Sequence, residues 1–400
     1  MIKVGLAFLL ITLLVLTGGP AQAQVPSEIL IGGTISKSGP FAAEVAPFDE
    51  LAHNWAKIIN EREGGIFLKE YGKKLPVRFI IYDDKTDAET SVKMYERLAT
   101  VDKVHLFIGP YSSPLTIRAS TVAEKYKIPM VTIEANADKI FQRGFKYIFG
   151  VIDSGTLWSI HYFDMLKREG KIKTMALIID DRPHTMDVGV GARRDAEKVG
   201  LKIVFDQVFP AKTTDFTATI TKLKALDPDL VYVSSFPDFA IVFMKQAKEL
   251  GLNPREFHII HAVKATTAAL GKDAMYITGE HFWAEGMKFG NVALYKEILD
   301  KTGIKHFDYP WSAIRMMGYD AIKAALEKAG TLDKERLREA LATLRYETLC
   351  GTNWFKPNGQ GHCNTVSQQF LGDRWYPIAP PEVAVPGKRV FPTPPWDKRP

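Results

Sequence analysis

The chain has 400 residues, of which 46% are hydrophobic and 24% are charged, and its formal net charge is +6. This apolar fraction is ordinary for a globular protein. Lysine and arginine occur in runs no longer than a pair, such as Lys73-Lys74 and Arg193-Arg194, which excludes a basic stripe for binding nucleic acid. The length suits two domains better than one ordinary core.

The first residues read MIKVGLAFLLITLLVLTGGPAQAQ, with one cation at Lys3, an apolar stretch of about thirteen residues and a small-residue exit at Ala23. This pattern predicts a secretory signal peptide over residues 1–23, cleaved after about Ala23. The apolar stretch is short for a membrane span, so an uncleaved anchor is the weaker alternative. Because no cysteine lies near the cleavage site, we expect no lipid anchor and predict release into a bacterial periplasm.

Strand-like and helix-like segments alternate after this leader, and the alternation restarts near residue 173. Apolar strands separated by helices are typical of parallel sheets covered on both faces, so the sequence predicts an α/β fold with two doubly wound, Rossmann-like lobes. The expected strands are 28–36, 75–84, 105–110, 128–133, 173–181, 201–209, 229–235 and 256–262. The expected helices include 47–63, one that begins at Ser113, 292–302, 309–329 and 332–344.

The two cysteines, Cys350 and Cys363, lie in the segment ETLCGTNWFKPNGQGHCNTV. This segment reads as two strands around a turn at residues 357–359, which would bring the two sulfurs together across a hairpin. Export favours a disulfide between them, and two free thiols are the alternative.

Polar and aromatic residues follow several of the expected strands. Ligands of open α/β sheets bind at the carboxyl ends of the strands, so these residues are candidates for a binding cleft. The segment GPYSSP places Tyr111, Ser112 and Ser113 before a helix, whose unpaired N–H groups favour a carboxylate or similar oxyanion. An ordinary polar turn with a capping serine is the alternative. The other candidates are Ser38, Glu134, Ala135, Asn136, His184, Thr185, Phe236, Asp238 and Lys264.

Sequence signatures of enzymes are missing from the chain. It contains no G-x-G-x-x-G after a strand, no phosphate-binding glycine-lysine loop, no H-E-x-x-H and no G-x-S-x-G, and its cysteine spacing offers no zinc site. We therefore predict a protein that is not an enzyme and uses no cofactor or metal. An exported enzyme acting on a small acid, with Ser113, His184 and Asp238 as a reacting trio, is the alternative.

Five segments follow one another in a recognisable order: ILIGGTISKSGP, YDDKTDAETSVKMYERLA, FIGPYSS, IPMVT and FGVIDS. This ordered set resembles the substrate-binding proteins of branched-chain amino acid type ABC transporters, which are type I periplasmic binding proteins. The resemblance covers nearly the whole mature chain. It implies two lobes joined by a three-strand hinge, which close on a ligand without chemistry and deliver it to a membrane permease.

The resemblance also implies that each lobe is built from two separated segments. We place the hinge crossings near residues 146–152, 275–285 and 346–352. Lobe 1 then comprises residues 24–148 and 281–346, and lobe 2 comprises residues 149–280 and 347–383. Beyond Trp375 the chain is rich in proline, and residues 384–400 are expected to form an extended tail.

Several site residues match family positions. Ser113 falls where the family's serine meets the ligand carboxylate, with Tyr111 and Ser112 beside it. The other matches are Ala135 and Asn136, in a stretch that supplies a carbonyl and a hydroxyl, and His184 or Thr185 and Phe236, near two tyrosine positions. Tyr111, Phe236, Trp158 and Trp283 could line an aromatic pocket, although core packing is the commoner use of such side chains.

The family's acid that receives the ligand ammonium should fall near Val263, where this chain has no acid and Lys264 is the next residue. Burying an ammonium group without an acid costs several kcal/mol, on the order of 3–5. Two explanations stay open. Either Glu134 receives the ammonium from the opposite lobe, or the ligand has no ammonium and is an aromatic or aliphatic acid or an amide, which we favour.

The sequence thus predicts a periplasmic solute-binding component of an ABC importer, which captures a small carboxylate, amide or amino acid between its lobes. The expected partners are this ligand and an ABC permease in the inner membrane, and the chain is expected to be a monomer that binds no nucleic acid. A periplasmic ligand sensor of the same fold is the main alternative.

Overall fold

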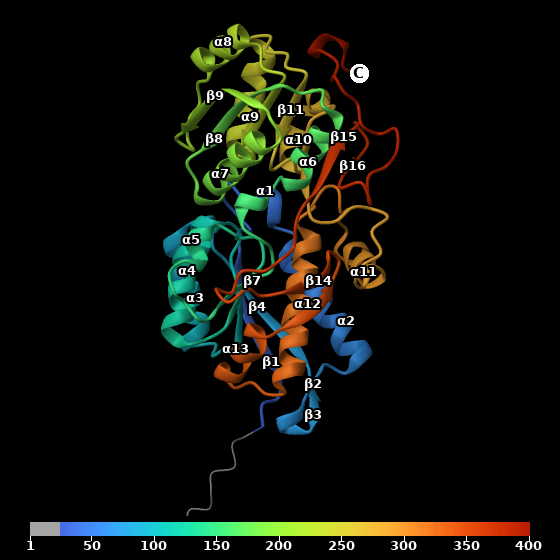
Figure 1. Ribbon diagram of the computed structural model, residues 1–400. Coiled ribbons are helices and arrows are strands. Elements are labelled where there is room, and N and C mark those ends of the chain that lie inside the picture. Colours follow the sequence, from blue (N-terminus) through green and yellow to red (C-terminus); the bar gives the residue numbers. More distant parts are fainter. Residues whose placement is uncertain (1–24) are drawn as a thin grey trace, which may run out of the picture.

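The computed structural model describes residues 25–400, which form two α/β lobes stacked end to end (Figure 1). The predicted signal peptide at residues 1–23 lies outside the described residues. The two-lobed α/β fold expected from the sequence is confirmed, because each lobe has its own sheet with helices packed against it. No helix within residues 25–400 is both long and apolar enough to cross a bilayer.

Lobe 1, the lower one in Figure 1, contains a five-stranded parallel sheet in the order β4-β1-β5-β6-β7. Its strands are β1 (Ile29–Ile35), β4 (Val77–Asp83), β5 (Leu106–Ile108), β6 (Met130–Thr132) and β7 (Ile148–Gly150). Its longer helices are α2 (Phe48–Glu63), α3 (Ala88–Thr100), α4 (Ser113–Tyr126), α11 (Val292–Thr302), α12 (Ser312–Ala329) and α13 (Lys334–Ala342). Short elements complete it: α1 (Ala42–Val45), α5 (Asp138–Phe141), and a ribbon of β2 (Ile66–Leu68) and β3 (Lys73–Leu75).

Lobe 2 contains a seven-stranded sheet in the order β16-β15-β12-β11-β10-β8-β9, in which β15 runs antiparallel to both of its neighbours, β12 and β16. Its strands are β8 (Thr174–Asp180), β9 (Lys202–Phe209), β10 (Leu230–Ser234), β11 (Glu256–Ile259), β12 (Thr278–His281), β15 (Val366–Phe370) and β16 (Trp375–Ala379). Its helices are α6 (Ile160–Glu169), α7 (Pro183–Lys198), α8 (Thr217–Leu226), α9 (Pro237–Glu249) and α10 (Lys264–Leu270).

The chain passes between the two sheets three times, after β7, after β12 and after the hairpin that follows α13. Lobe 1 is therefore completed by three late helices, shown in orange in Figure 1, and lobe 2 by the two late strands β15 and β16. The exact residues at which one lobe ends and the other begins, as proposed from the sequence, stay a prediction.

Helix α12 is buried along most of its length, up to its exposed last turn, and crosses lobe 1 close to the sheet. A Cβ atom at Gly318 would lie 2.5 Å from the side chain of Ile133, so only glycine permits this approach. Because Ile133 immediately follows β6, the contact fixes the start of α12 beside the carboxyl end of that strand. Glu134 and Arg315 are thereby brought together.

The two cysteines form a disulfide, with their Cα atoms 6.2 Å apart. The expected pairing of strands around residues 357–359 is wrong: β14 (Gly351–Trp354) pairs with β13 (Arg345–Thr348) on its other side. The chain does turn at residues 357–359, but the segment after it lies against β7, where Gly150 N donates to Gly359 O at 2.8 Å. Contacts with lobe 1 therefore replace the local hairpin.

The proline-rich segment 384–400 has little regular structure but is packed along lobe 2, where it appears in red in Figure 1. Trp396 is 8% exposed and its Nε1 donates to Leu252 O at 2.8 Å. Arg389 forms an ion pair with the fully buried Glu256 at 2.5 Å. The expectation of an extended tail therefore needs correction, because these side chains dock the segment onto the sheet.

Candidate ligand-binding site

A small cavity lies where the carboxyl ends of strands from both lobes face each other. The centre of a water-sized sphere can occupy only about 10 Å³ of it, about the space of one water molecule, so side chains nearly fill the site in this structure. Lobe 1 contributes Tyr111, Ser112, Ser113, Glu134, Trp311 and Ile314, and lobe 2 contributes Trp158, His184, Phe236 and His261. The lining is thus drawn from both lobes and is mainly aromatic.

The link between β5 and α4 forms one wall of the cavity. Ser112 adopts φ +76° and ψ 148°, a conformation almost restricted to glycine, and its buried hydroxyl finds no partner within residues 25–400. The hydroxyl of Ser113 accepts a hydrogen bond from Ala137 N at 3.1 Å. Since α4 begins at Ser113, its free N–H groups and positive dipole end lie at this wall. The wall therefore suits an anionic ligand group.

Glu134 and Arg315 form an ion pair at the base of the cavity, with side chains that are 2% and 0% exposed. Arg315 Nε donates to Glu134 Oε1, and the guanidinium lies 5.4 Å from the ring centre of Phe48. Burial raises the pKa of Glu134 to about 7, although Arg315 acts in the opposite direction. Its second oxygen, Oε2, has no hydrogen-bond partner in the described part of the chain.

Two histidines form the wall from lobe 2. The rings of His184 and His261 stack with their centroids 5.2 Å apart and their planes 13° from parallel. Burial lowers the pKa of His184 to about 3, and burial together with the charges of His184 and Arg182 holds the pKa of His261 well below its usual range. Both imidazoles are therefore neutral near pH 7. Trp158 covers the edge of His184, with the ring centroids 4.6 Å apart.

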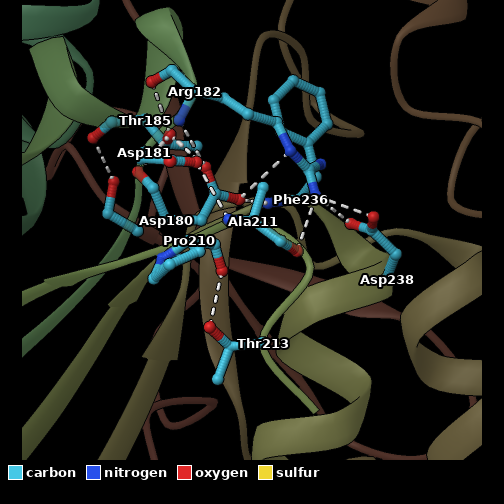
Figure 2. Close-up of polar contacts among 10 residues, drawn as sticks. Asp180, Asp181, Arg182, Thr185, Pro210, Ala211, Thr213, Phe236 and Asp238 are labelled. Atoms are coloured by element: carbon cyan, nitrogen blue, oxygen red, sulfur yellow. Dashed lines mark hydrogen bonds and ion pairs between the residues drawn. The ribbon is translucent and has the colours of Figure 1, made fainter.

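Arg182 is not part of the cavity lining but contacts Phe236, which is, and Figure 2 shows its polar contacts. Its guanidinium lies 4.7 Å from the ring centre of Phe236 and forms hydrogen bonds of 2.8 and 2.7 Å with the carboxylate of Asp238. Asp180, at the end of β8, accepts from the backbone N of both Arg182 and Phe236 at 3.0 Å. This network fixes the Phe236 ring at the edge of the cleft.

The lobes touch each other around the cavity. Phe41, beside α1 of lobe 1, stacks on Phe236 of lobe 2 with centroids 5.4 Å apart. Asp138 N, at the start of α5, donates to Asp187 Oδ2 of α7 at 2.7 Å. The structure therefore shows the two lobes closed over the site.

The profile of the periplasmic binding protein family matches residues 28–371. The chain belongs to the periplasmic binding protein family. It is 26% identical over 337 residues to the leucine-, isoleucine-, valine-, threonine- and alanine-binding protein of Pseudomonas aeruginosa, a match that covers 81% of this chain and 86% of that protein. The resemblance proposed from the sequence is thus confirmed.

Solved structures of substrate-binding proteins share the fold of this periplasmic binding protein. A branched-chain amino acid transporter substrate-binding protein of Streptococcus pneumoniae, in complex with isoleucine, matches with a TM-score of 0.74, 21% identity and coverage of 87% of this chain and 97% of that one. An ABC transporter solute-binding protein of R. palustris, in complex with benzoate, matches with a TM-score of 0.72, 16% identity and coverage of 92% and 97%. At these identities the similarity shows the fold alone.

The structure brings half of the sequence-predicted site residues of this periplasmic binding protein to the cavity. These are Tyr111, Ser112, Ser113, Glu134, His184 and Phe236. Their contact with a ligand stays a prediction. Trp158 also lines the cavity, whereas Trp283 lines a separate hollow beside α11.

The remaining candidates lie outside the cavity lining. Ser38 is exposed and donates to Asp83 Oδ2 at 2.7 Å, and Lys264 reaches Asp308 at 3.3 Å. Ala135 is buried, Asn136 Nδ2 donates to Asp153 O at 2.7 Å, Thr185 donates to Asp180 O at 2.9 Å, and Asp238 pairs with Arg182.

The reacting trio considered from the sequence does not assemble. Neither ring nitrogen of His184 has a hydrogen-bond partner within residues 25–400, and Asp238 pairs with Arg182. Three lining residues escaped the sequence analysis, namely His261, Trp311 and Ile314. His261 follows a strand, as the other candidates do. Trp311 and Ile314 lie at the start of α12, after the chain has come back to lobe 1, and no strand end in the sequence marks them as candidates.

Proposed function

We propose that this chain is the solute-binding subunit of an ABC importer and that its ligand is a small aromatic carboxylate without an ammonium group. One observation supports this choice above the others. Glu134 is the one carboxylate residue among the described residues that line the cavity, and its charge is already paired with Arg315. The lining therefore has an attractive wall for an anion, and its one carboxylate is already paired. The nearby carboxylate of Glu44 lies behind the lining and accepts from Tyr111 OH at 2.7 Å.

An amino acid would bring an ammonium group into this environment. Arg315 already neutralises Glu134, so the ammonium would share one carboxylate with a buried guanidinium. Such an uncompensated buried charge costs several kcal/mol, on the order of 3–5. Among the described residues, lobe 2 contributes no carboxylate to the lining, so it supplies no second negative charge for an ammonium.

The lining also favours an aromatic ligand. Tyr111, Trp158, Phe236 and Trp311 present ring surfaces, which make offset and edge-to-face contacts with another ring. The carboxylate is expected at the Ser112 hydroxyl and the start of α4.

The test compares ligands that differ by the ammonium group alone. Isothermal titration of the mature protein would use 3-phenylpropanoate against phenylalanine, and 4-methylpentanoate against leucine, with benzoate and benzamide added. We expect the amine-free aromatic acid of the first pair to bind at least tenfold tighter than phenylalanine. Tighter binding of either amino acid would overturn the proposed ligand class and assign the ammonium to Glu134.

Delivery to a permease and the monomeric state are further parts of this proposal. Light scattering of the ligand-bound protein should give the mass of one chain. Proteoliposomes that contain the permease should import the bound acid only when this protein is present, and chromatography should recover the acid unchanged. A chemically altered ligand would favour an enzyme instead.

A further inference from the structure

The cavity contains several buried polar atoms that have no hydrogen-bond partner in the part of the chain that the structure describes. They are Ser112 Oγ, Glu134 Oε2, Trp158 Nε1, His184 Nδ1 and Nε2, His261 Nδ1 and Trp311 Nε1. Arg315 Nη1 and Nη2, beside Glu134, are unpartnered donors as well. Buried polar groups are normally satisfied, so a ligand is expected to complete them. Their chemistry therefore describes the ligand that the cleft is built to hold.

Most of these atoms can donate a hydrogen bond. The indole nitrogens are donors only, a neutral imidazole offers one N–H, and the serine hydroxyl can rotate to donate. These groups require an acceptor-rich ligand such as a carboxylate. Two atoms can only accept: one nitrogen of the neutral His184 ring, and Glu134 Oε2 in the ionised form that the contact with Arg315 favours. A ligand that satisfies the whole cavity must therefore carry at least one donor.

The position of Arg315 decides what kind of donor this is. It contacts the other oxygen of the same carboxylate through Nε, so the pair is already neutral before a ligand enters. A charged donor would place a second cation on the carboxylate that already pairs with Arg315, whereas a hydroxyl would supply the hydrogen bond without a second positive charge beside that guanidinium.

We infer that the ligand is an aromatic carboxylate that also carries a hydroxyl group, and that this hydroxyl donates to Glu134 Oε2. The inference rests on the proposed function, since it describes a second contact made by the same ligand. It assigns Glu134 the role of recognising a neutral hydroxyl in place of an ammonium. The unpartnered oxygen beside a charge-paired one is the feature that carries it.

The first part of the test uses the mature protein and five ligands. Benzoate is compared with its 2-, 3- and 4-hydroxy derivatives, and with the methoxy derivative that matches whichever hydroxy acid binds best. A methoxy group accepts a hydrogen bond but cannot donate one. We expect one hydroxybenzoate to bind at least tenfold tighter than benzoate, a difference of about 1.4 kcal/mol, and its methoxy analogue to bind no tighter than benzoate.

The second part of the test removes the acceptor, Glu134, together with Arg315, so that no unpaired charge is left buried. The double variant Glu134→Leu/Arg315→Met replaces both partners by apolar residues, an exchange that proteins generally tolerate. It should lose the preference for the hydroxyl, so that the hydroxy acid and benzoate bind this variant with equal affinity. The control, Arg62→Met/Glu297→Leu, removes a partly exposed ion pair of lobe 1 and should keep the preference.

The outcomes separate the two proposals. If benzoate and all hydroxybenzoates bind equally, or if the cleft variant keeps the preference for the hydroxyl, the role of Glu134 is wrong and the carboxylate ligand stands. If none of the aromatic acids binds the unaltered protein, both the ligand class and the hydroxyl contact are overturned. Circular dichroism at the binding temperature shows whether each variant is folded.

Discussion

Phe41 of lobe 1 and Phe236 of lobe 2 stack across the cleft, with ring centroids 5.4 Å apart and planes 27° from parallel. Phe41 also meets Tyr111 edge-on at 5.2 Å, so one ring bridges the two walls of the cavity. This contact exists only while the lobes are closed.

The substitution Phe41→Ala should therefore weaken ligand binding about tenfold, since an aromatic pair contributes about 0.5–1.5 kcal/mol beyond the burial of its surface. The ligand must then supply more of the free energy of closure. Titration calorimetry measures the affinity, and X-ray scattering measures the decrease in radius of gyration on ligand addition. Phe67→Ala, at a ring that is 48% exposed, is the matched control. Equal affinities for the two variants would show that the stack does not contribute to closure.

Ser112→Gly should change stability and binding in opposite directions. Its φ of +76° and ψ of 148° cost a non-glycine residue about 1–3 kcal/mol, so glycine should raise the free energy of unfolding by about 1 kcal/mol. Loss of the hydroxyl should weaken carboxylate binding. Ser112→Ala keeps the strain and loses the hydroxyl, so it should weaken binding without the gain in stability. Urea denaturation and calorimetry measure both effects, and a destabilised glycine variant would contradict the strained backbone.

Arg389→Met should destabilise lobe 2 by about 3–5 kcal/mol, because Glu256 would keep a buried carboxylate without its cation. Tyr162 donates to the same carboxylate at 2.5 Å but brings no charge. Lys388→Met, at the neighbouring half-buried position, removes no ion pair and should have little effect. The double variant Arg389→Met/Glu256→Gln should recover most of the loss. Thermal unfolding compares the four proteins, and a normal melting temperature for Arg389→Met would show that the docked segment is dispensable.

Glu280→Gln should stabilise the protein at pH 8 and leave it nearly unchanged at pH 5. Glu280 is fully buried on β12, Ser367 Oγ donates to its carboxyl at 3.0 Å, and burial raises its pKa to about 8. In the unfolded chain the carboxyl group ionises near 4.5, the ordinary pKa of a glutamate side chain. Its contribution to stability is therefore complete below about pH 4.5 and is lost as the pH rises toward 8, since the unfolded state releases the proton first.

The measurement is urea unfolding of the parent and variant at both pH values. Glu285→Gln, at a side chain that is 69% exposed, is the control and should show no pH-dependent difference. The comparison cancels the effect of buried histidines that lie away from Glu280, whereas His258, whose Nε2 is 3.6 Å from Glu280 Oε1, contributes to the difference. A variant that gains nothing between pH 5 and pH 8 would mean that Glu280 is ionised in the folded protein.

The sequence by itself determined the α/β alternation, the two lobes and the half of the candidate site that follows strands. Apolar runs and helix starts are local signals, and the carboxyl ends of parallel strands necessarily meet at one edge of a sheet. Tyr111, Ser112 and Ser113 could be placed for that reason.

Only the tertiary structure decided what those residues face. Arg315 meets Glu134 across 181 positions of sequence, because glycine at 318 lets α12 approach the sheet, and no local pattern encodes that approach. Sequence spacing also does not determine where a side chain points after a strand ends. Asp238 and Lys264 were therefore predicted in the site, whereas in the structure they pair with Arg182 and Asp308. Charge pairing and burial depend on which distant segments come together, and they decide which polar atoms remain for a ligand.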